Sequence, residues 1–186
     1  MSPGNWHMLT PDLIRSRILR YRSFGHTDLS VSEICFNVSQ LLLNSSATTS
    51  KAFLANLMDQ AQAYGVNTFT ADHVRNDFLA QEFLAHSFHQ KRHQINLFLR
   101  CSAYDPPSEL NLTRLSSPSE LIRVNCEQSL RILKTDYLDN LSVLSSPTQY
   151  EELDHILYTL DILKTEGKIR SGGLSLDIDP QQPYDE

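Results

Sequence analysis

Segments typical of buried strands and segments typical of amphipathic helices alternate along this chain from residue 34 onward. Such alternation is the pattern of βαβ units, in which helices connect the neighbouring strands of a parallel sheet. The sequence therefore predicts an α/β fold. Four helices are expected to connect five strands, which are predicted at 34–37, 67–70, 95–101, 138–144 and 169–176.

Capping residues mark the boundaries of the predicted helices. The first helix (50–64) stops at Gly65, which suits the left-handed position after a helix, and the second is placed at 77–88. The third opens with SPSE from Ser117, a capping box, and the fourth opens with SPTQ from Ser146 and ends at Gly167. The apolar stripes expected to be buried are, in chain order, Leu54, Leu57, Met58, Ala61 and Tyr64; Phe78, Leu79, Phe83 and Leu84; Ile122, Cys126, Leu130 and Leu133; and Leu153, Ile156, Leu157, Leu160 and Leu163.

Composition excludes several classes of protein. With 186 residues, 40% hydrophobic and 20% charged, the chain has the composition of one globular domain. A net charge of -6 without a block of Lys and Arg argues against binding to nucleic acid or to an anionic membrane. The three cysteines form no CxxC pair, so no disulfide framework or zinc site is indicated. The N-terminus lacks the apolar run of a signal peptide, and no stretch of 18 apolar residues occurs, so we expect a cytoplasmic protein.

Four segments carry a resemblance to a known family: YRSFGHTDLSVSEICF (21–36), AYGVNTFTADH (63–73), VNCEQSLRILKTDYLD (124–139) and GKIRSGGLS (167–175). Together they resemble the aldo-keto reductases, whose fold is a (β/α)8 barrel. A complete barrel of this kind has eight strands and about 250 residues. The resemblance implies a partial, TIM-barrel-like α/β fold of about five strands, truncated relative to the family. We expect an N-terminal arm at 1–20, the partial barrel at 21–176 and a polar tail at 177–186.

The resemblance also implies where a catalytic tetrad of Asp, Tyr, Lys and His would lie. In an alignment without gaps, these four positions hold Thr70, Arg75, Arg100 and Leu144. A guanidinium is effectively never deprotonated, so Arg75 cannot replace the tyrosine as proton donor, and Leu144 has no polar atom with which to orient a substrate. A shift by one residue would bring Asp72 nearer the Asp position but would leave Arg75 where the tyrosine belongs. We therefore predict that no catalytic residue is retained.

The cofactor contacts implied by the resemblance are also incomplete. In the family a Ser-Asn pair after the fifth strand holds the nicotinamide carboxamide, and here Ser175 is followed by Leu176. No GxGxxG or GxxxxGKS loop is present as a substitute. We predict that the protein uses no cofactor; the alternative is NADP.

Alternation within the strands predicts a partly polar inner face. Side chains at Asn96, Phe98 and Arg100 would point to the barrel axis, as would Asn140 and Ser142. Two interpretations stay open: a wet or partner-facing inner surface, or the ordinary tolerance of barrels for polar residues near the axis.

Two further clusters of side chains could form sites. Arg75 and Arg100 would lie at the carboxyl ends of neighbouring strands and together could bind a small anion; the alternative is that both are solvated or ion-paired. The spacing of His86, His89 and His93 could gather three rings on a helix, but the segment is more typical of an exposed helix end. We predict no metal site.

The sequence thus favours a catalytically inactive aldo-keto reductase-like protein that acts through protein contacts in a regulatory or scaffolding role. Its partner would be another protein or a second copy, bound at the open edge of the partial barrel, because unpaired strand edges invite association. The alternative is an NADP-dependent oxidoreductase that reduces small carbonyl compounds, or a fragment of one. A third possibility is a decayed gene product without a selected function.

Overall fold

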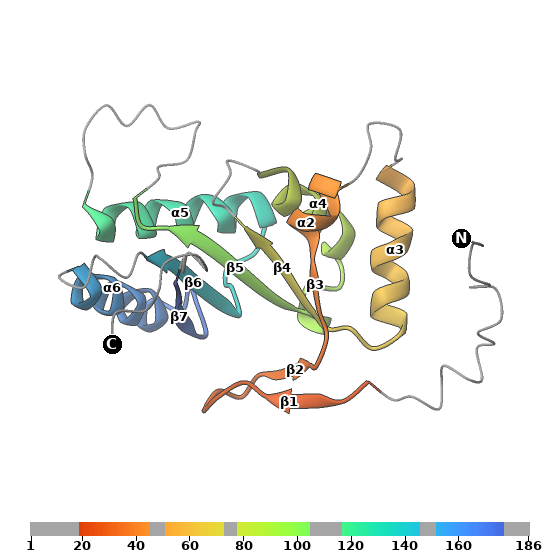
Figure 1. Cartoon of the computed structure of the whole chain (residues 1–186), viewed down its shortest axis with the longest axis horizontal. Helices are drawn as coiled ribbons and strands as arrows, with labels where there is room; N and C mark the ends of the chain where they lie inside the picture. The colour runs from red at the N-terminus through yellow and green to blue at the C-terminus, as the bar shows by residue number, and fades with distance from the viewer. Residues whose placement is uncertain (1–18, 45–50, 73–77, 105–116, 146–151, 177–186) are drawn as a thin grey trace, which may run out of the picture.

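The computed structural model describes residues 19–44, 51–72, 78–104, 117–145 and 152–176. Its main sheet has five parallel strands in chain order, which confirms the predicted α/β fold (Figure 1). The strands are β3 (Cys35–Asn37), β4 (Thr68–Asp72), β5 (Asn96–Ser102), β6 (Asn140–Ser145) and β7 (Gly172–Leu176). Parallel strands that follow one another in order, each joined by a helix, form the wall of a (β/α)8 barrel.

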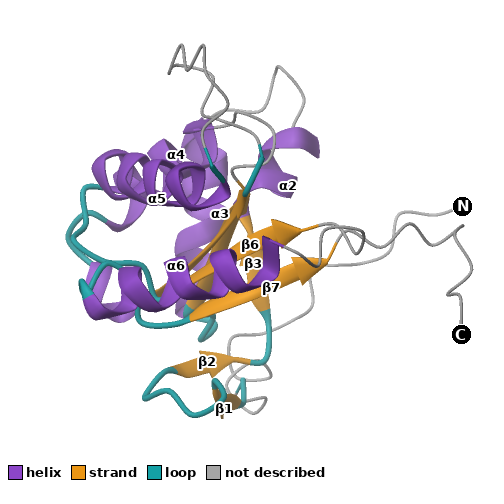
Figure 2. Ribbon diagram, turned by 90° about the vertical axis from the view of Figure 1, so that its left-hand side faces the viewer, coloured by secondary structure: helices purple, strands orange, loops and turns teal. Residues whose placement is uncertain are grey.

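Helices cover one face of this sheet, as Figure 2 shows from the side. They are α2 (Val38–Asn44), α3 (Lys51–Ala63), α4 (Phe78–Phe88), α5 (Pro118–Leu133) and α6 (Leu153–Thr165), with a short 3-10 helix, η2 (Arg92–Gln94), before β5. Helix α2 was not predicted, because it has seven residues and follows β3 directly. Its start is marked by Asn37, whose Oδ1 accepts a hydrogen bond from the amide of Gln40 at 2.9 Å.

A small antiparallel hairpin, also not predicted, closes the amino end of the sheet. It consists of β1 (Tyr21–Ser23) and β2 (Ser30–Ser32), which are too short to show a clear alternation (Figure 1). The ring of Phe24 lies 4.8 Å from that of Phe98, and Asn96 Nδ2 donates to the carbonyl of Ser30 at 2.9 Å. The hairpin therefore contacts two of the side chains that the sequence placed on the inner face.

The predicted helix boundaries are confirmed where the structure describes them. Ser117 Oγ accepts from the amide of Glu120, and the Glu120 carboxylate accepts from the amide of Ser117, which completes the capping box. Gly65 and Gly167 have φ angles of 97° and 74°, the left-handed conformation expected after a helix. The predicted SPTQ start lies outside the described residues, as do most of the predicted arm and the tail.

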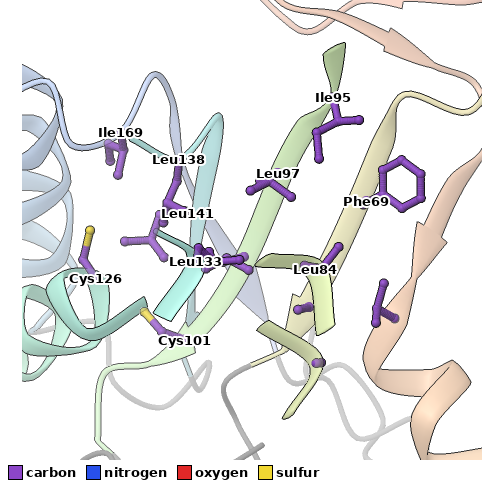
Figure 3. Packing of buried hydrophobic residues seen from close by; sticks show 14 of the residues in the cluster. Phe69, Leu84, Ile95, Leu97, Cys101, Cys126, Leu133, Leu138, Leu141 and Ile169 are labelled. Carbon is purple, nitrogen blue, oxygen red and sulfur yellow. The ribbon is translucent and has the colours of Figure 1, made fainter. Parts of the chain in front are cut away.

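The core lies between the sheet and the helices, and Figure 3 shows its centre. Leu97, Leu99, Leu141 and Val143 point to the helices, as alternation predicted, and pack together with Phe69 against the buried sides of α4, α5 and α6. The prediction of burial is wrong for three residues of the apolar stripes, because Tyr64, Leu79 and Leu157 are exposed. Tyr64 follows the last residue of α3, whereas Leu79 and Leu157 lie one position, about 100°, beyond the buried Phe78 and Ile156.

A buried carboxylate joins the amino ends of β5 and β6. Asp139, 1% exposed, pairs through Oδ2 with Arg92 at 2.8 Å and through Oδ1 with Arg170 at 3.0 Å. Its Oδ2 also accepts from the amide of Leu97 at 2.9 Å. Arg92 in turn lies over the ring of Tyr137, 4.2 Å from the ring centre. Each charge of this network is thus partnered, which is the condition for burying charge without a large penalty.

Within the described parts of the chain, every helix is too short or too polar to cross a membrane.

Candidate functional site

The side chains at the carboxyl end of the sheet form two successive rows on its inner face. Strand register places Asp72, Arg100, Ser142 and Gly173 side by side, and we call this set the inner row. Two residues further along, Ser102, Leu144 and Ser175 form the outer row. Because side chains alternate along a strand, both rows face away from the helices. In barrels of this architecture, the carboxyl ends of the strands carry the functional site.

An ion pair dominates the inner row. Asp72 Oδ2 lies 3.1 Å from Arg100 Nη2, and the two residues are Cα partners on neighbouring strands. The Asp72 side chain is 16% exposed and that of Arg100 is 39% exposed. The amide of Asp72 donates to Ser39 Oγ at 2.9 Å, so this end of β4 is also fixed by α2. Arg100 Nε is buried and has no hydrogen-bond partner among the described residues.

The three described positions of the implied tetrad do not lie in one row. Thr70 lies one row below Asp72 and pairs in register with Phe98. Arg100 belongs to the inner row and Leu144 to the outer row, where Leu144 is half-buried. Arg75 lies outside the described residues, so the proposed anion site of Arg75 and Arg100 stays a prediction.

The aspartate that pairs with Arg100 is Asp72. Thr70, which the alignment without gaps puts at the Asp position of the tetrad, pairs in register with Phe98 instead. In the sequence, Asp72 comes near the Asp position of the tetrad only after a shift of the alignment by one residue. The signal was available in the alternation, because Thr70 and Asp72 share one face of β4, and the register of β4 and β5 decides which of them reaches Arg100.

Chemically, the inner row offers a neutralised pair. A carboxylate and a guanidinium that are bound to each other have no net charge as a pair. Neither group donates a proton near neutral pH. The two rows contain no tyrosine or histidine. Ser175, the predicted remnant of a nicotinamide contact, lies half-buried beside Leu144 in the outer row. A tyrosine does follow the end of β5: the amide of Tyr104 donates to Ser102 Oγ at 3.1 Å.

The histidines and cysteines lie elsewhere. His86 is on α4, His89 in the turn after it and His93 in η2; all three are exposed. No three His, Cys, Asp or Glu side chains come together as a metal site in the part of the chain that the structure describes. Cys101 and Cys126 are buried in the core, and burial raises the pKa of each thiol to about 12.

Comparison with known proteins places this geometry in a family. Residues 41–182, more than half of the chain, match the model of the aldo/keto reductase family. No curated protein matches the sequence significantly.

Solved structures show the same fold. An aldo-keto reductase, AKR11C1, from Bacillus halodurans in its holo form is similar with a TM-score of 0.67 and 24% identity; the match covers 86% of this chain and 51% of that one. A putative aldo-keto reductase from Pseudomonas aeruginosa is similar with a TM-score of 0.70 and 21% identity, over 89% of this chain and 63% of that one. The chain thus spans about half to three fifths of the length of these relatives. With its five-stranded parallel sheet and this match over residues 41–182, the chain belongs to the aldo/keto reductase family.

Proposed function

We propose that this chain is a non-catalytic member of its family that acts through protein contacts along the open sides of its partial barrel. The observation that carries the proposal is the inner row, where Asp72 and Arg100 neutralise each other. A reductase needs a group that can give a proton to the carbonyl oxygen as hydride arrives. Neither member of this pair is such a group, and Leu144 in the next row has no proton to give.

The two edges of the sheet support the proposed role in protein contacts. Among the described strands, none pairs with the outer edge of β3 or of β7. Helix α6, which leads into β7, exposes Leu157 and Tyr158 side by side, at 43% and 67%. Helix α3, at the opposite flank, exposes Phe53. Unpaired strand edges beside exposed apolar side chains are features of surfaces that bind another polypeptide.

Sedimentation velocity tests the contact surface. The purified chain is expected to associate with itself or with a partner. The double variant on α6, Leu157→Glu combined with Tyr158→Glu, is expected to weaken that association at least tenfold. Leu79→Glu is the matched control, because Leu79 is about as exposed as Leu157 but lies on α4 rather than on α6. Unchanged association in the α6 variant, or equal loss in the control, contradicts this surface.

A second candidate function is an NADP-dependent oxidoreductase of small carbonyl compounds, favoured by family membership and by Tyr104. This tyrosine lies just beyond the carboxyl end of β5, the strand that carries Arg100. In this alternative Tyr104 is the replacement acid. Carbonyl-dependent oxidation of NADPH that is lost in Tyr104→Phe would establish the alternative and refute the non-catalytic proposal.

A further inference from the structure

A groove on the helical face lies at the opposite end of the molecule from the inner row. It has a volume of about 700 Å³ and lies between the C-terminal parts of α4 and α5. These helix ends lead into β5 and β6, so the groove is at the amino end of the sheet. Its volume is in the range of small-molecule sites, about 300–1,000 Å³.

Cationic side chains dominate the lining of this groove. Lys91, Arg131 and Lys134 contribute three positive charges, against one negative charge from Glu82. The whole chain has a net charge of -6, so this local excess of positive charge opposes the overall balance. Opposite charge is the feature that draws an anionic ligand to a concave surface.

Two of these three cations form no ion pair within the described structure. Of the Lys and Arg side chains that are described, only Arg131, Lys134 and Lys164 form no ion pair with a described carboxylate; the others pair at 4.0 Å or less. Arg131 and Lys134 lie together in the groove, whereas Lys164 lies at the end of α6. The unpaired positive charge is therefore concentrated at this place.

Cations at a helix C-terminus also have a structural explanation, because they offset the negative pole of the helix. At the end of α5, however, backbone amides already bond two of the last carbonyls: Lys134 N donates to Arg131 O, and Thr135 N donates to Leu130 O. The side chains of Arg131 and Lys134 are not engaged in this cap. Lys134 also occupies the left-handed position with a φ of 53°, where glycine is favoured, so this cation lies at a strained position.

A hydroxyl group adds a neutral donor to the same groove. Ser87 lines it, and Ser87 Oγ is buried without a hydrogen-bond partner among the described residues. His86 and His89 add two imidazoles to the lining. Guanidinium and ammonium groups are common partners of phosphate oxygens, and the hydroxyl and the imidazoles add further hydrogen-bonding groups.

We propose that the groove between the ends of α4 and α5 is an anion-binding site that takes a phosphorylated small molecule. Arg131 and Lys134 supply the charge, and Ser87 supplies a hydrogen bond. The site is separate from the inner row and does not depend on the function proposed above.

Titration calorimetry of the whole chain with inorganic pyrophosphate at low ionic strength tests the site. Saturable binding is expected. The double variant Arg131→Gln with Lys134→Gln is expected to weaken binding at least tenfold, and Ser87→Ala about tenfold, the effect of losing one hydrogen bond to a charged group. Lys164→Gln is the matched control, an exposed and unpaired cation on the neighbouring helix, and should change affinity less than twofold.

Three results would overturn the proposal. They are the absence of saturable binding, an equal loss in Lys164→Gln, and binding of an oligoglutamate peptide as tight as that of pyrophosphate, which would mark a general acidic-peptide surface instead. Circular dichroism of each variant confirms that the fold is retained.

Discussion

Asp72 and Arg100 face each other across two neighbouring parallel strands, as Cα partners whose charged atoms are 3.1 Å apart. The pair links β4 to β5 at the end of the sheet where barrels of this architecture carry their functional site. It engages one nitrogen of the guanidinium, and it leaves the inner row without net charge. The structural role of this pair can be separated from any chemical role by measuring stability.

We expect Asp72→Asn to lower the free energy of unfolding by about 1 kcal/mol, because the pair is partly exposed and solvent screens it. Arg100→Gln should have a similar effect, and the double variant should lose less than the sum. Urea unfolding of the three variants measures this coupling. Asp59→Asn is the control, since Asp59 pairs with Lys91 at 3.4 Å with both side chains well exposed. Strictly additive losses would show that the two groups do not interact in solution.

The buried Asp139 network should matter far more. Asp139→Ala leaves Arg92 without its carboxylate partner, and loss of one member of a buried pair costs about 3–5 kcal/mol. Asp28→Ala removes a carboxylate that also pairs with Arg170, at 2.8 Å, but is 82% exposed; the expected loss is below about 1 kcal/mol. Chemical unfolding followed by circular dichroism compares them. Equal losses in the two variants would refute the assignment of Asp139 as a central structural group.

Thiol reactivity should distinguish the three cysteines. Cys35 is an exposed residue, although partial burial of its thiol raises the pKa of Cys35 as well. Cys101 and Cys126 are buried in the core, and burial raises the pKa of each to about 12, so neither forms thiolate near pH 8. Titration with a disulfide reagent at pH 8 should label one thiol rapidly and the other two only after unfolding. In Cys35→Ser the rapid phase should vanish. Rapid labelling of more than one thiol in the native protein would contradict the packing between β5 and α5.

Glu166 should make stability depend on pH in the acid range. Hydrogen bonds from Lys168 and then Arg123 lower the pKa of this carboxyl below its ordinary value of 4.5. A group with a lowered folded-state pKa stabilises the protein above its unfolded pKa, and the effect is lost as pH falls through the folded value. The melting temperature of Glu166→Gln should therefore lie below that of the wild type at pH 7, and the gap should close on going well below pH 4.5. Asp161→Asn, exposed on α6, should show no such gap; a gap that persists at low pH would exclude the ionised carboxylate as its cause.

The sequence predicted the features that depend on a single helix or strand. The strands lie within a few residues of their predicted places because they alternate with helices whose boundaries are set locally, as by the SPSE box at Ser117. Features that depend on contacts between distant segments were missed. The β1–β2 hairpin has three-residue strands held by contacts such as Phe24 on Phe98, and Asp139 and its two partners, Arg92 and Arg170, come from three separate segments. The same limit applied to the site, because the register between β4 and β5 decides that Asp72, rather than Thr70, meets Arg100.

The most direct test of the non-catalytic proposal is NADPH binding by the purified chain, followed by nicotinamide fluorescence with a parallel thermal-shift scan. A ligand that binds the native state must raise its stability, so the two readouts check each other. The proposal predicts no saturable binding and no shift up to about 1 mM NADPH, which corresponds to a binding free energy weaker than about -4 kcal/mol. Saturable binding at micromolar NADPH, with a matching rise in melting temperature, would contradict the proposal and would favour the oxidoreductase.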